Sequence, residues 1–325
     1  MIDRDLVSGK RIVVTGGTGS LGKACVQRLL AGDVGVPDKI IVFSRDEGKH
    51  YQMLTEFAQA ERGTEESIYR NFQRRLEFRI GDVRDYDSVA QVVTDADFVI
   101  HAAALKQVPT CEYFPQEAVR TNIDGAANVV RAIRQHGRSV TKAVAVSTDK
   151  ACKPVNVMGM TKAIQERIFI EANLGCARTA FLAVRYGNVV ASRGSVVPLF
   201  KSQIRAGGPV TITTPEMTRF LISLDDAVST IFAALADGGP GETYVPQIPS
   251  ARMLDLARVM IGDRPIELRE VGIRPGEKVH EILISEEEMH RTVERGEYYV
   301  ILPMLPELAN GVKVLPGLLR EYSSE

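Results

Sequence analysis

The chain has 325 residues, a net charge of −1 and 25% charged residues, which is the balance of an ordinary globular protein. A chain so close to neutral has no global field to attract nucleic acid or an anionic membrane, so we expect neither as a partner. The N-terminus is charged, and no apolar run reaches the roughly 18 residues that span a membrane. We therefore expect a cytoplasmic protein without membrane insertion. Cys25, Cys111, Cys152 and Cys176 lack metal-binding spacing, which predicts buried reduced thiols and no metal site.

The first part of the chain alternates apolar, β-branched runs with helical patterns, which is typical of parallel strands buried on both faces. The expected strands are Arg11–Thr15, Lys39–Phe43, Leu76–Ile80, Phe98–Ala102, Lys142–Ser147 and Thr179–Arg185. The expected helices are Lys23–Leu30, Glu47–Glu61, Tyr86–Val93, Pro115–Gln135 and Gly159–Ala172. This alternation predicts an α/β fold with a doubly wound parallel sheet in a domain of residues 1–187.

A glycine-rich turn joins the first strand to the first helix in "RIVVTGGTGSLGKACVQRLL". Gly16, Gly19 and Gly22 have the spacing that allows a tight turn, close approach of backbone to a diphosphate, and close packing of helix on strand. An anion at the start of this helix would meet free amides and the helix dipole. The turn therefore predicts a dinucleotide site that also includes Thr18, Ser20 and Leu21.

The end of the second strand bears on which dinucleotide binds. Ser44 and Arg45 come first there, and Asp46 follows. An acid at this place binds the ribose hydroxyls of NAD, whereas an arginine accommodates the 2′-phosphate of NADP. The order of residues favours NADP, and NAD stays possible if Arg45 is only a solvated turn residue.

Two further strand ends complete the predicted cofactor site. Asp82 and Val83, in "GDVRD", follow the third strand and are placed to contact the adenine. The fourth strand ends in "IHAAALKQV", where small residues allow close approach of the backbone to the cofactor and Lys106 is an unexplained charge. From this segment we expect contacts from Ala102, Ala103, Ala104 and Lys106.

The stretch "AVAVSTDKACKPVNVMGMTK" carries the candidate chemistry. Thr148, Asp149 and Lys150 lie at the carboxyl end of a predicted strand, where open α/β sheets place their ligands. Lys162 follows Met158 by four residues on the next helix. Met158 has no titratable group, so it cannot exchange a proton. The structural alternative for Asp149 and Lys150 is a plain salt bridge at the strand end.

After residue 187 the pattern loosens, and Gly and Pro interrupt it. Residues 188–325 are predicted to form a smaller C-terminal substrate-binding lobe, some of whose segments return to the main sheet. Lys201 and Arg205 share one face of a predicted helix and face either a diphosphate or water. The run Glu286–Glu288 is predicted to be a solvated helix start.

Taken together, the motifs resemble the extended short-chain dehydrogenases/reductases, and within them the UDP-N-acetylglucosamine 4,6-dehydratases. The matching stretches cover residues from about 8 to 305 and are "TGGTGSLG", "FSRDE", "HAAALKQVP", "YFPQEAVRTNIDGAANV", "STDKACKPVN", "RYGNVVASRGSVVP" and "RPGEKVHEILISEEE". Such enzymes normally have a tyrosine where this chain has Met158, although some branches of the family carry methionine.

The resemblance implies a reaction with no net redox change. Carbon-4 of the sugar is oxidised, water is eliminated across carbon-5 and carbon-6, and the hydride returns to carbon-6. It also implies that Asp149 is the acid, Lys150 the carbon-5 base and Lys162 the ligand of the nicotinamide ribose. Thr148 would hydrogen-bond the 4-hydroxyl, and Asp149 would take its proton. For these roles we expect a protonated Asp149 and a neutral Lys150.

The resemblance extends to the remaining site residues. Tyr186 is expected at the cofactor, and a UDP-sugar is expected at Lys106, Met158, Asn188, Ser195, Val196, Pro198, Lys201, Thr213, Arg219, Arg274 and Glu277. Relatives are commonly dimers or larger, so we expect a homo-oligomer. A 4-epimerase, a dehydratase for another nucleotide sugar and a non-catalytic NADP-binding sensor or scaffold remain open as alternatives.

Overall fold

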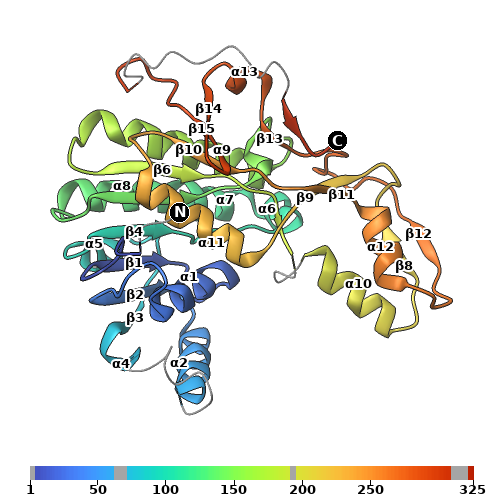
Figure 1. The fold of residues 1–325 in the computed structure, drawn as a ribbon, viewed down its shortest axis with the longest axis horizontal. Coiled ribbons are helices and arrows are strands. Elements are labelled where there is room, and N and C mark those ends of the chain that lie inside the picture. The colour runs from blue at the N-terminus through green and yellow to red at the C-terminus, as the bar shows by residue number, and fades with distance from the viewer. Residues whose placement is uncertain (1–3, 62–71, 191–194, 309–320) are drawn as a thin grey trace.

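A computed structural model describes residues 4–61, 72–190, 195–308 and 321–325 (Figure 1). Its centre is a nine-stranded sheet. In spatial order the strands are β14 (Thr292–Arg295), β15 (Tyr298–Ile301), β10 (Thr243–Pro246), β6 (Ala180–Val184), β5 (Lys142–Val146), β4 (Phe98–His101), β1 (Arg11–Thr15), β2 (Lys39–Ser44) and β3 (Leu76–Ile80). From β3 to β10 all neighbours pair in parallel, and β15 and β14 continue the sheet antiparallel.

Helices cover both faces of this sheet, as the sequence predicted. One face carries α1 (Ser20–Ala31), α2 (Glu47–Glu61) and α11 (Leu224–Asp237), and the other carries α5 (Tyr86–Val93), α8 (Gly125–Gln135) and α9 (Val157–Ala172). Side chains along each strand alternate between the two cores, so Ile12 packs in the first and Val13 in the second. The doubly wound α/β prediction is confirmed, because two apolar layers sandwich a sheet whose central strands are buried.

The predicted helix Pro115–Gln135 is not uniform. It consists of α7 (Pro115–Ala118), a π-helical segment Val119–Asp124, and α8. The buried Asn122 on the π segment accepts from the Leu105 amide at 2.8 Å and donates to the Leu105 carbonyl at 2.9 Å. The irregular segment thus holds the loop between β4 and the next helix, α6 (Val108–Tyr113), against the sheet.

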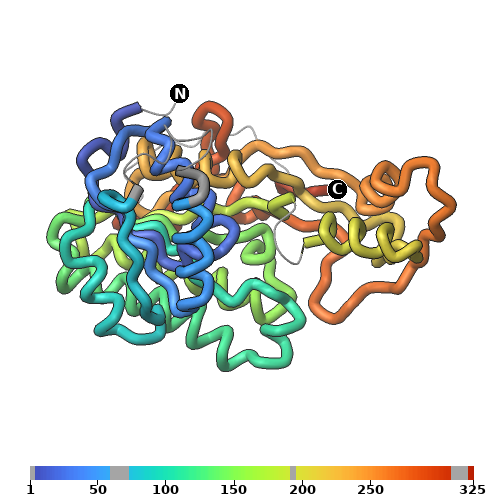
Figure 2. Tube along the Cα trace, turned by 90° about the horizontal axis from the view of Figure 1, so that it is seen from below, coloured from blue at the N-terminus to red at the C-terminus, as the bar shows by residue number. Residues whose placement is uncertain are grey.

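A small lobe extends to one side of the sheet (Figures 1 and 2). It contains α10 (Val196–Arg205), β8 (Val210–Ile212), α12 (Met253–Ile261) and β12 (Leu268–Glu270). Phe200, Ile212 and Ile261 form part of its own apolar core. Between its two visits to the lobe the chain returns to the main body as α11 and β10, and after the second visit it adds β14 and β15 to the main sheet.

Two short sheets connect the lobe to the main body. One consists of β7 (Asn188–Val189), β9 (Thr218–Ile222) and β11 (Ser250–Arg252), and the other of β13 (Ile282–Ile284) and β16 (Tyr322–Ser323). The remaining short helices are α4 (Phe72–Arg75), Asp149–Ala151, Asn173–Gly175 and α13 (Glu286–Met289).

Several local predictions are corrected. Helix α1 begins at Ser20 rather than Lys23, so the third glycine of the turn is already helical. Glu288, expected in solvent, is buried beside Arg185, while Glu286 and Glu287 are exposed. The four cysteines are buried and free, as predicted. Among the described residues, no helix is both long enough and apolar enough to cross a membrane.

Candidate functional site

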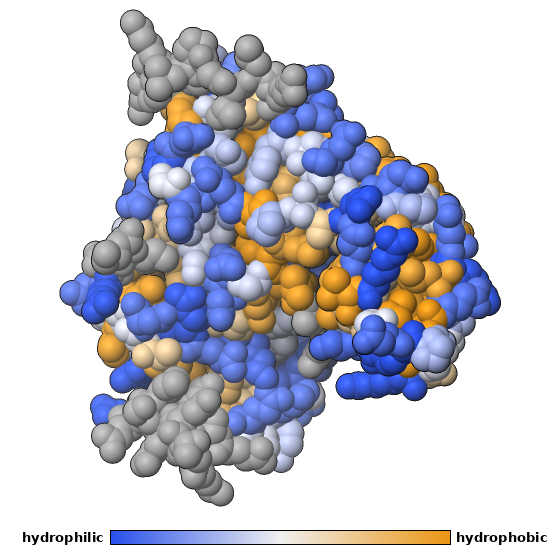
Figure 3. All heavy atoms as spheres, turned by 45° about the vertical axis from the view of Figure 1, so that its right-hand side comes forward, coloured by the Kyte–Doolittle hydropathy of each residue, from blue (hydrophilic) through white to orange (hydrophobic). Residues whose placement is uncertain are grey.

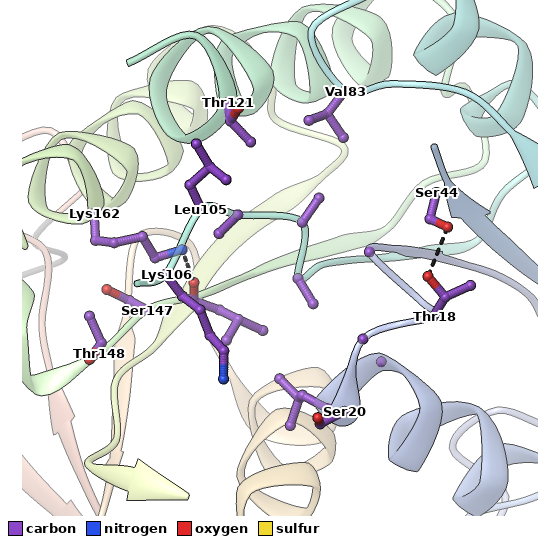
Figure 4. A pocket seen from close by; sticks show the side chains of 18 of the residues that line it. Thr18, Ser20, Ser44, Val83, Leu105, Lys106, Thr121, Ser147, Thr148 and Lys162 are labelled. Atoms are coloured by element: carbon purple, nitrogen blue, oxygen red, sulfur yellow. Dashed lines mark hydrogen bonds between the residues drawn. The ribbon is translucent and has the colours of Figure 1, made fainter. Parts of the chain in front are cut away.

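A cavity of about 500 Å³ runs along the carboxyl ends of the parallel strands (Figure 4). Its lining contains every residue that the sequence predicted at the cofactor, namely Gly16, Thr18, Gly19, Ser20, Leu21, Gly22, Ser44, Arg45, Asp82, Val83, Ala102, Ala103, Ala104, Lys106, Lys162 and Tyr186. The lining also includes Thr148, Lys150 and Met158. The cavity therefore brings the predicted cofactor residues and most of the predicted catalytic residues together.

The glycine turn forms one wall of the cavity. Gly16 has φ +66°, and a Cβ atom there would lie 2.7 Å from the Ala103 nitrogen. A Cβ atom on Gly22 would lie 2.5 Å from the Cα atom of Gly17. No side chain caps the start of α1, and its first turn contains no acidic residue. The turn and the free amides therefore fit the diphosphate of a dinucleotide.

The end of β2 combines hydroxyl and basic groups. The hydroxyls of Thr18 and Ser44 are 2.9 Å apart (Figure 4). The Arg45 side chain is 57% exposed, and its guanidinium is 3.8 Å from the Asp82 carboxylate. Lys49, which sequence reasoning missed, also lines the cavity and pairs with Asp46 at 2.7 Å. Arg45 is therefore held loosely enough to meet an anionic group on a ribose.

The strand-end triplet lies at the other end of the cavity. Thr148 precedes the short helix Asp149–Ala151, and the Asp149 side chain is fully buried. Asp149 Oδ1 accepts from the Thr148 hydroxyl at 2.8 Å and from Lys150 Nζ at 3.0 Å. Asp149 Oδ2 is buried and has no hydrogen-bond partner in the described part of the chain. Asp149 therefore has one carboxylate oxygen that is free to accept a further hydrogen bond or a proton.

Lys150 has three oxygen partners. Besides Asp149, its Nζ lies 3.2 Å from Asn188 Oδ1 and 3.3 Å from Glu281 Oε1. Burial acts to lower the pKa of Lys150, but the charges of Asp149 and Glu281 outweigh it and raise this pKa above the usual 10.5. Burial alone therefore does not make Lys150 neutral, contrary to the expectation, because it brings two carboxylates to the amine.

Glu281 was missed by sequence reasoning, although it lies inside the quoted stretch "RPGEKVHEILISEEE". It is 2% exposed and directly precedes β13. The available signal was a charged residue leading into an apolar run. That signal does not predict which part of the fold the apolar run will pack against, so the contact between Glu281 and Lys150 could not be foreseen.

Lys162 projects from α9 into the cavity (Figure 4). Its Nζ donates to the Val146 carbonyl at 2.5 Å and to Gln165 Oε1 at 2.8 Å. Burial, only partly opposed by the charge of Glu166, lowers the pKa of Lys162 to about 7. An amine held at the end of β5 with this pKa can donate a hydrogen bond near neutral pH.

Met158 lies one turn before Lys162 and is 4% exposed. It packs with Cys111 and Ala118 while also lining the cavity. A Cβ atom on the next residue, Gly159, would lie 2.2 Å from the Lys150 carbonyl oxygen. The start of α9 is therefore in direct contact with the backbone that carries the Asp149–Lys150 pair.

The residues predicted to bind the substrate fall into several places. Ser195, Val196, Pro198 and Lys201 lie at the start of α10, outside the cavity lining, and Lys201 is exposed. Glu277 Oε2 accepts from Thr213 Oγ1 at 3.4 Å and from the exposed Arg274's backbone amide at 3.3 Å.

Arg219 is buried and uses its terminal nitrogens on backbone carbonyls. Nη1 donates to Thr218 and Val279, and Nη2 donates to Lys278. Its Nε atom lies 4.0 Å from Glu281. The structure thus gives Arg219 a role in holding this segment beside Lys150, rather than a free guanidinium.

No cluster of three or more His, Cys, Asp or Glu side chains suited to a metal ion occurs within the described ranges. The polar groups gathered at the cavity are instead hydroxyls, amines and single carboxylates, which are donors and acceptors of protons.

Comparison with known proteins agrees with this geometry. A "UDP-N-acetylglucosamine 4,6-dehydratase (inverting)" of Campylobacter jejuni is 43% identical over 303 residues, 92% of this chain and 85% of the relative. A "UDP-glucose 4-epimerase" of Rickettsia bellii is 43% identical over 97% of this chain and 91% of its own.

Solved structures share the fold. That of Pen from Bacillus thuringiensis has a TM-score of 0.85 and 34% identity, covering 98% of this chain and 95% of that chain. A more distant one is DesIV, a dTDP-glucose 4,6-dehydratase from Streptomyces venezuelae solved with NAD, at TM-score 0.70 and 22% identity over 83% and 86% of the two chains. The sequence profile of the polysaccharide biosynthesis proteins matches residues 12–303. With that match over most of its length, the chain belongs to the polysaccharide biosynthesis protein family.

Proposed function

We propose that the chain is a UDP-N-acetylglucosamine 4,6-dehydratase. The observation that carries the proposal is the pairing of Lys150 with the buried Asp149 at the end of β5, beside a cavity that fits a dinucleotide. Removing a proton from carbon-5 and delivering one to a leaving hydroxyl needs a base and an acid side by side. The relative named as this dehydratase supports the choice of sugar nucleotide.

The first step is oxidation at carbon-4. A nicotinamide dinucleotide, when bound, supplies the hydride chemistry. Thr148 is placed to hydrogen-bond the sugar hydroxyl, and its own hydroxyl is already bonded to Asp149. Asp149 takes the proton through this contact, since Met158 offers no titratable group. Lys162, whose Nζ donates to the Val146 carbonyl, would bind the cofactor ribose.

The second step is elimination. Once carbon-4 is a ketone, the proton on carbon-5 becomes acidic, and Lys150 removes it. Asp149 then returns its proton to the departing carbon-6 hydroxyl, which leaves as water. Lys150 can act only after losing its own proton, because the charges of Asp149 and Glu281 outweigh burial and raise its pKa.

The preferred cofactor in this proposal is NADP. Arg45 and Lys49 both line the cavity at the end of β2, where Arg45 directly follows the strand and Asp46, which also lines the cavity, comes after it. Two basic side chains suit a ribose 2′-phosphate. NAD is the alternative, and the structure of DesIV contains it. Mass spectrometry of cofactor released from the purified protein distinguishes the two.

The UDP moiety is proposed to lie between the cavity and the lobe. Asn188, which contacts Lys150, marks the boundary between sugar and diphosphate. Arg274 would bind the phosphates. Glu277 would accept hydrogen bonds from the hydroxyls of the uridine ribose, and Thr213 would donate a hydrogen bond to it. Ser195, Val196, Pro198 and Lys201 would line the nucleotide from α10, and Lys106 would reach the sugar from the other side.

Mass spectrometry tests the proposed function. Incubation with UDP-N-acetylglucosamine should give a product lighter by one water. A product of unchanged mass would instead identify a 4-epimerase, the activity named for the Rickettsia relative. No conversion of several UDP- and dTDP-sugars, with cofactor bound, would favour a non-catalytic sensor.

A further inference from the structure

Glu281 is a buried carboxylate to which the proposed reaction gives no role. Its Oε1 atom lies 3.3 Å from Lys150 Nζ. Its Oε2 atom is buried and has no hydrogen-bond partner in the described part of the chain; Lys278 Nζ is 3.8 Å from it. A buried charged group normally has its hydrogen-bonding capacity filled, so a carboxylate that places one oxygen beside a catalytic amine and leaves the other unbonded calls for a function.

The fold fixes Glu281 from two sides. Its backbone amide donates to Ser324 Oγ at 2.9 Å, and the Ser324 amide donates to the Glu281 carbonyl at 2.8 Å. Ser324 is fully buried and its hydroxyl also contacts Thr218 Oγ1 at 2.8 Å. The segment around β16 therefore clamps the backbone of Glu281 next to β9, which leaves its side chain little freedom to turn away from Lys150.

We propose that Glu281 is the positioning residue that accepts the proton of Lys150 and so prepares this amine to act as the carbon-5 base. The inference rests on the proposed function. Within the site, Lys150 faces Asp149 on its own short helix, Glu281 before β13 and Arg219 on β9. Glu281 faces Lys150, Arg219 and Lys278.

The transfer is balanced without any further reactant. An N–H bond of the Lys150 ammonium breaks and an O–H bond forms on Glu281, leaving a neutral amine and a neutral acid. The amine lone pair then takes the carbon-5 proton, and the electron pair of the C–H bond moves toward the carbon-4 ketone. After elimination Lys150 returns a proton to carbon-5, and Glu281 returns its proton to Lys150.

A substrate that displaces water favours this transfer. In a medium of low polarity the charged pair loses its solvation, and the neutral acid and amine become competitive with it. Asp149 cannot serve instead, because it already takes the proton of the 4-hydroxyl. Glu281, whose Oε1 atom lies 3.3 Å from Lys150 Nζ, is the other carboxylate paired with Lys150 among the described residues.

The test compares Glu281→Gln with the wild-type protein containing its cofactor. Glutamine keeps the shape but cannot take the proton. Carbon-4 oxidation does not need Lys150, so reduced nicotinamide should still form on adding UDP-N-acetylglucosamine. Deuterium uptake at carbon-5 and product release should fall by about 10²-fold near neutral pH and recover as pH rises. Reduced nicotinamide should therefore accumulate in the variant.

A different result for Glu281→Gln would contradict the proposal. If Glu281 only balances the charge of Lys150, its removal lowers the pKa of Lys150, and the variant becomes as active as the wild type or more active at low pH. That outcome overturns the inference. Glu286→Gln, a change to an exposed carboxylate on α13, should behave as wild type.

A second variant distinguishes the position of the Glu281 side chain from its ability to accept the proton of Lys150. Ser324→Ala removes the hydroxyl that contacts the Glu281 amide but keeps the carboxylate. Ser324→Ala should lower the rate of deuterium exchange at carbon-5, but this rate should not recover at high pH as it does in Glu281→Gln. The same pH profile for both variants would mean that only packing was lost. Failure of the wild type itself to form reduced nicotinamide or product would refute the proposed function instead.

Discussion

Asp149 and Lys150 are neighbours in sequence and share one partly buried network with Thr148, Asn188 and Glu281. The position of the pair was predictable, because the carboxyl end of a buried parallel strand is where such sheets place ligands. Its protonation was not predictable from burial alone, since the charges of both Asp149 and Glu281 oppose burial, and Glu281 lies more than a hundred residues further along the chain.

Removal of the Lys150 amine should separate catalysis from binding. In Lys150→Met the carbon-5 proton has no acceptor, so we expect dehydration to fall by about 10²- to 10⁴-fold. Bound cofactor, measured by its ultraviolet absorbance after release, should stay at the wild-type ratio. Lys153→Met is the matched control, because Lys153 follows in the same loop and pairs with Glu286 and Glu321 near the surface. Equal rates for the two variants would refute the role of Lys150.

Removal of the Arg45 guanidinium should change the choice of cofactor. Arg45→Ala should weaken NADP by about tenfold, or about 1.4 kcal/mol, and leave NAD affinity unchanged. Calorimetric titration of apoprotein with each dinucleotide measures both. Arg79→Ala, at an exposed position on β3 outside the cavity lining, is the control. An equal loss for NAD and NADP would mean that Arg45 does not contact the 2′-phosphate.

Helix α9 acts at the scale of an element, since it carries Lys162 and packs on the Lys150 backbone. Its existence followed from sequence, but its close contact with the strand-end loop did not. Gly159 permits that contact, and a side chain there would collide with the Lys150 carbonyl. The π segment Val119–Asp124 also escaped prediction, because its register depends on Asn122 meeting a loop from elsewhere in the chain.

Gly159→Ala adds only one methyl group, but it should reduce both stability and activity. The new Cβ atom needs room 2.2 Å from a backbone oxygen, so the Lys150 loop must shift. We expect a loss of about 1–3 kcal/mol in the free energy of unfolding and a larger relative loss of kcat. Gly48→Ala on α2, where the nearest atom is 3.5 Å from the new Cβ, should be neutral or stabilising. Wild-type kcat in Gly159→Ala would contradict this account of the loop.

A buried charge cluster joins β6, α9 and α13. Arg185 pairs with Glu166 at 2.7 Å and with Glu288 at 2.8 Å. Burial acts to raise the pKa of Glu288, but the charge of Arg185 and its hydrogen bond prevail and lower this pKa from 4.5 to about 2. A carboxyl with a lowered folded-state pKa stabilises the protein above pH 4.5, and this stabilisation is lost as pH falls toward 2.

Glu288→Gln should cost about 3–5 kcal/mol of unfolding free energy at pH 7, because Arg185 loses half of its compensating charge. The difference from wild type should shrink as pH falls from 4.5 toward 2. Urea unfolding at pH 7 and at acid pH measures it, with Glu287→Gln on the same helix as the exposed control. A difference that grows toward acid pH would contradict the assigned sign.

The cavity lies between the main sheet, which can be predicted well from the sequence, and the lobe, which can be predicted only poorly. Strands β1, β2, β4, β5 and β6 are mostly apolar and are recognisable in the sequence, whereas β14 and β15 are short and partly polar. Figure 3 shows apolar surface on the side of the lobe, between charged residues. The lobe's helices and strands meet through contacts distant in sequence, so their packing depends on the folded chain.

Exposed apolar side chains bear on the expected homo-oligomer. Tyr113, Phe114, Met160 and Ile164 are 46–83% exposed around α6 and α9, which contact each other. We expect these residues to be covered by a second copy of the chain. Light scattering should give at least twice 35.7 kDa, and Ile164→Lys should lower that mass. A mass of one chain at micromolar concentration would contradict the expectation.

The most direct test of the central claim is the reaction of the wild-type protein with UDP-N-acetylglucosamine in deuterated water. Mass spectrometry and proton NMR of the product report dehydration and exchange together. We predict a 4-keto-6-deoxy sugar nucleotide that has lost one water and carries solvent deuterium at carbon-5. A product of unchanged formula with only the carbon-4 configuration altered would contradict the dehydratase.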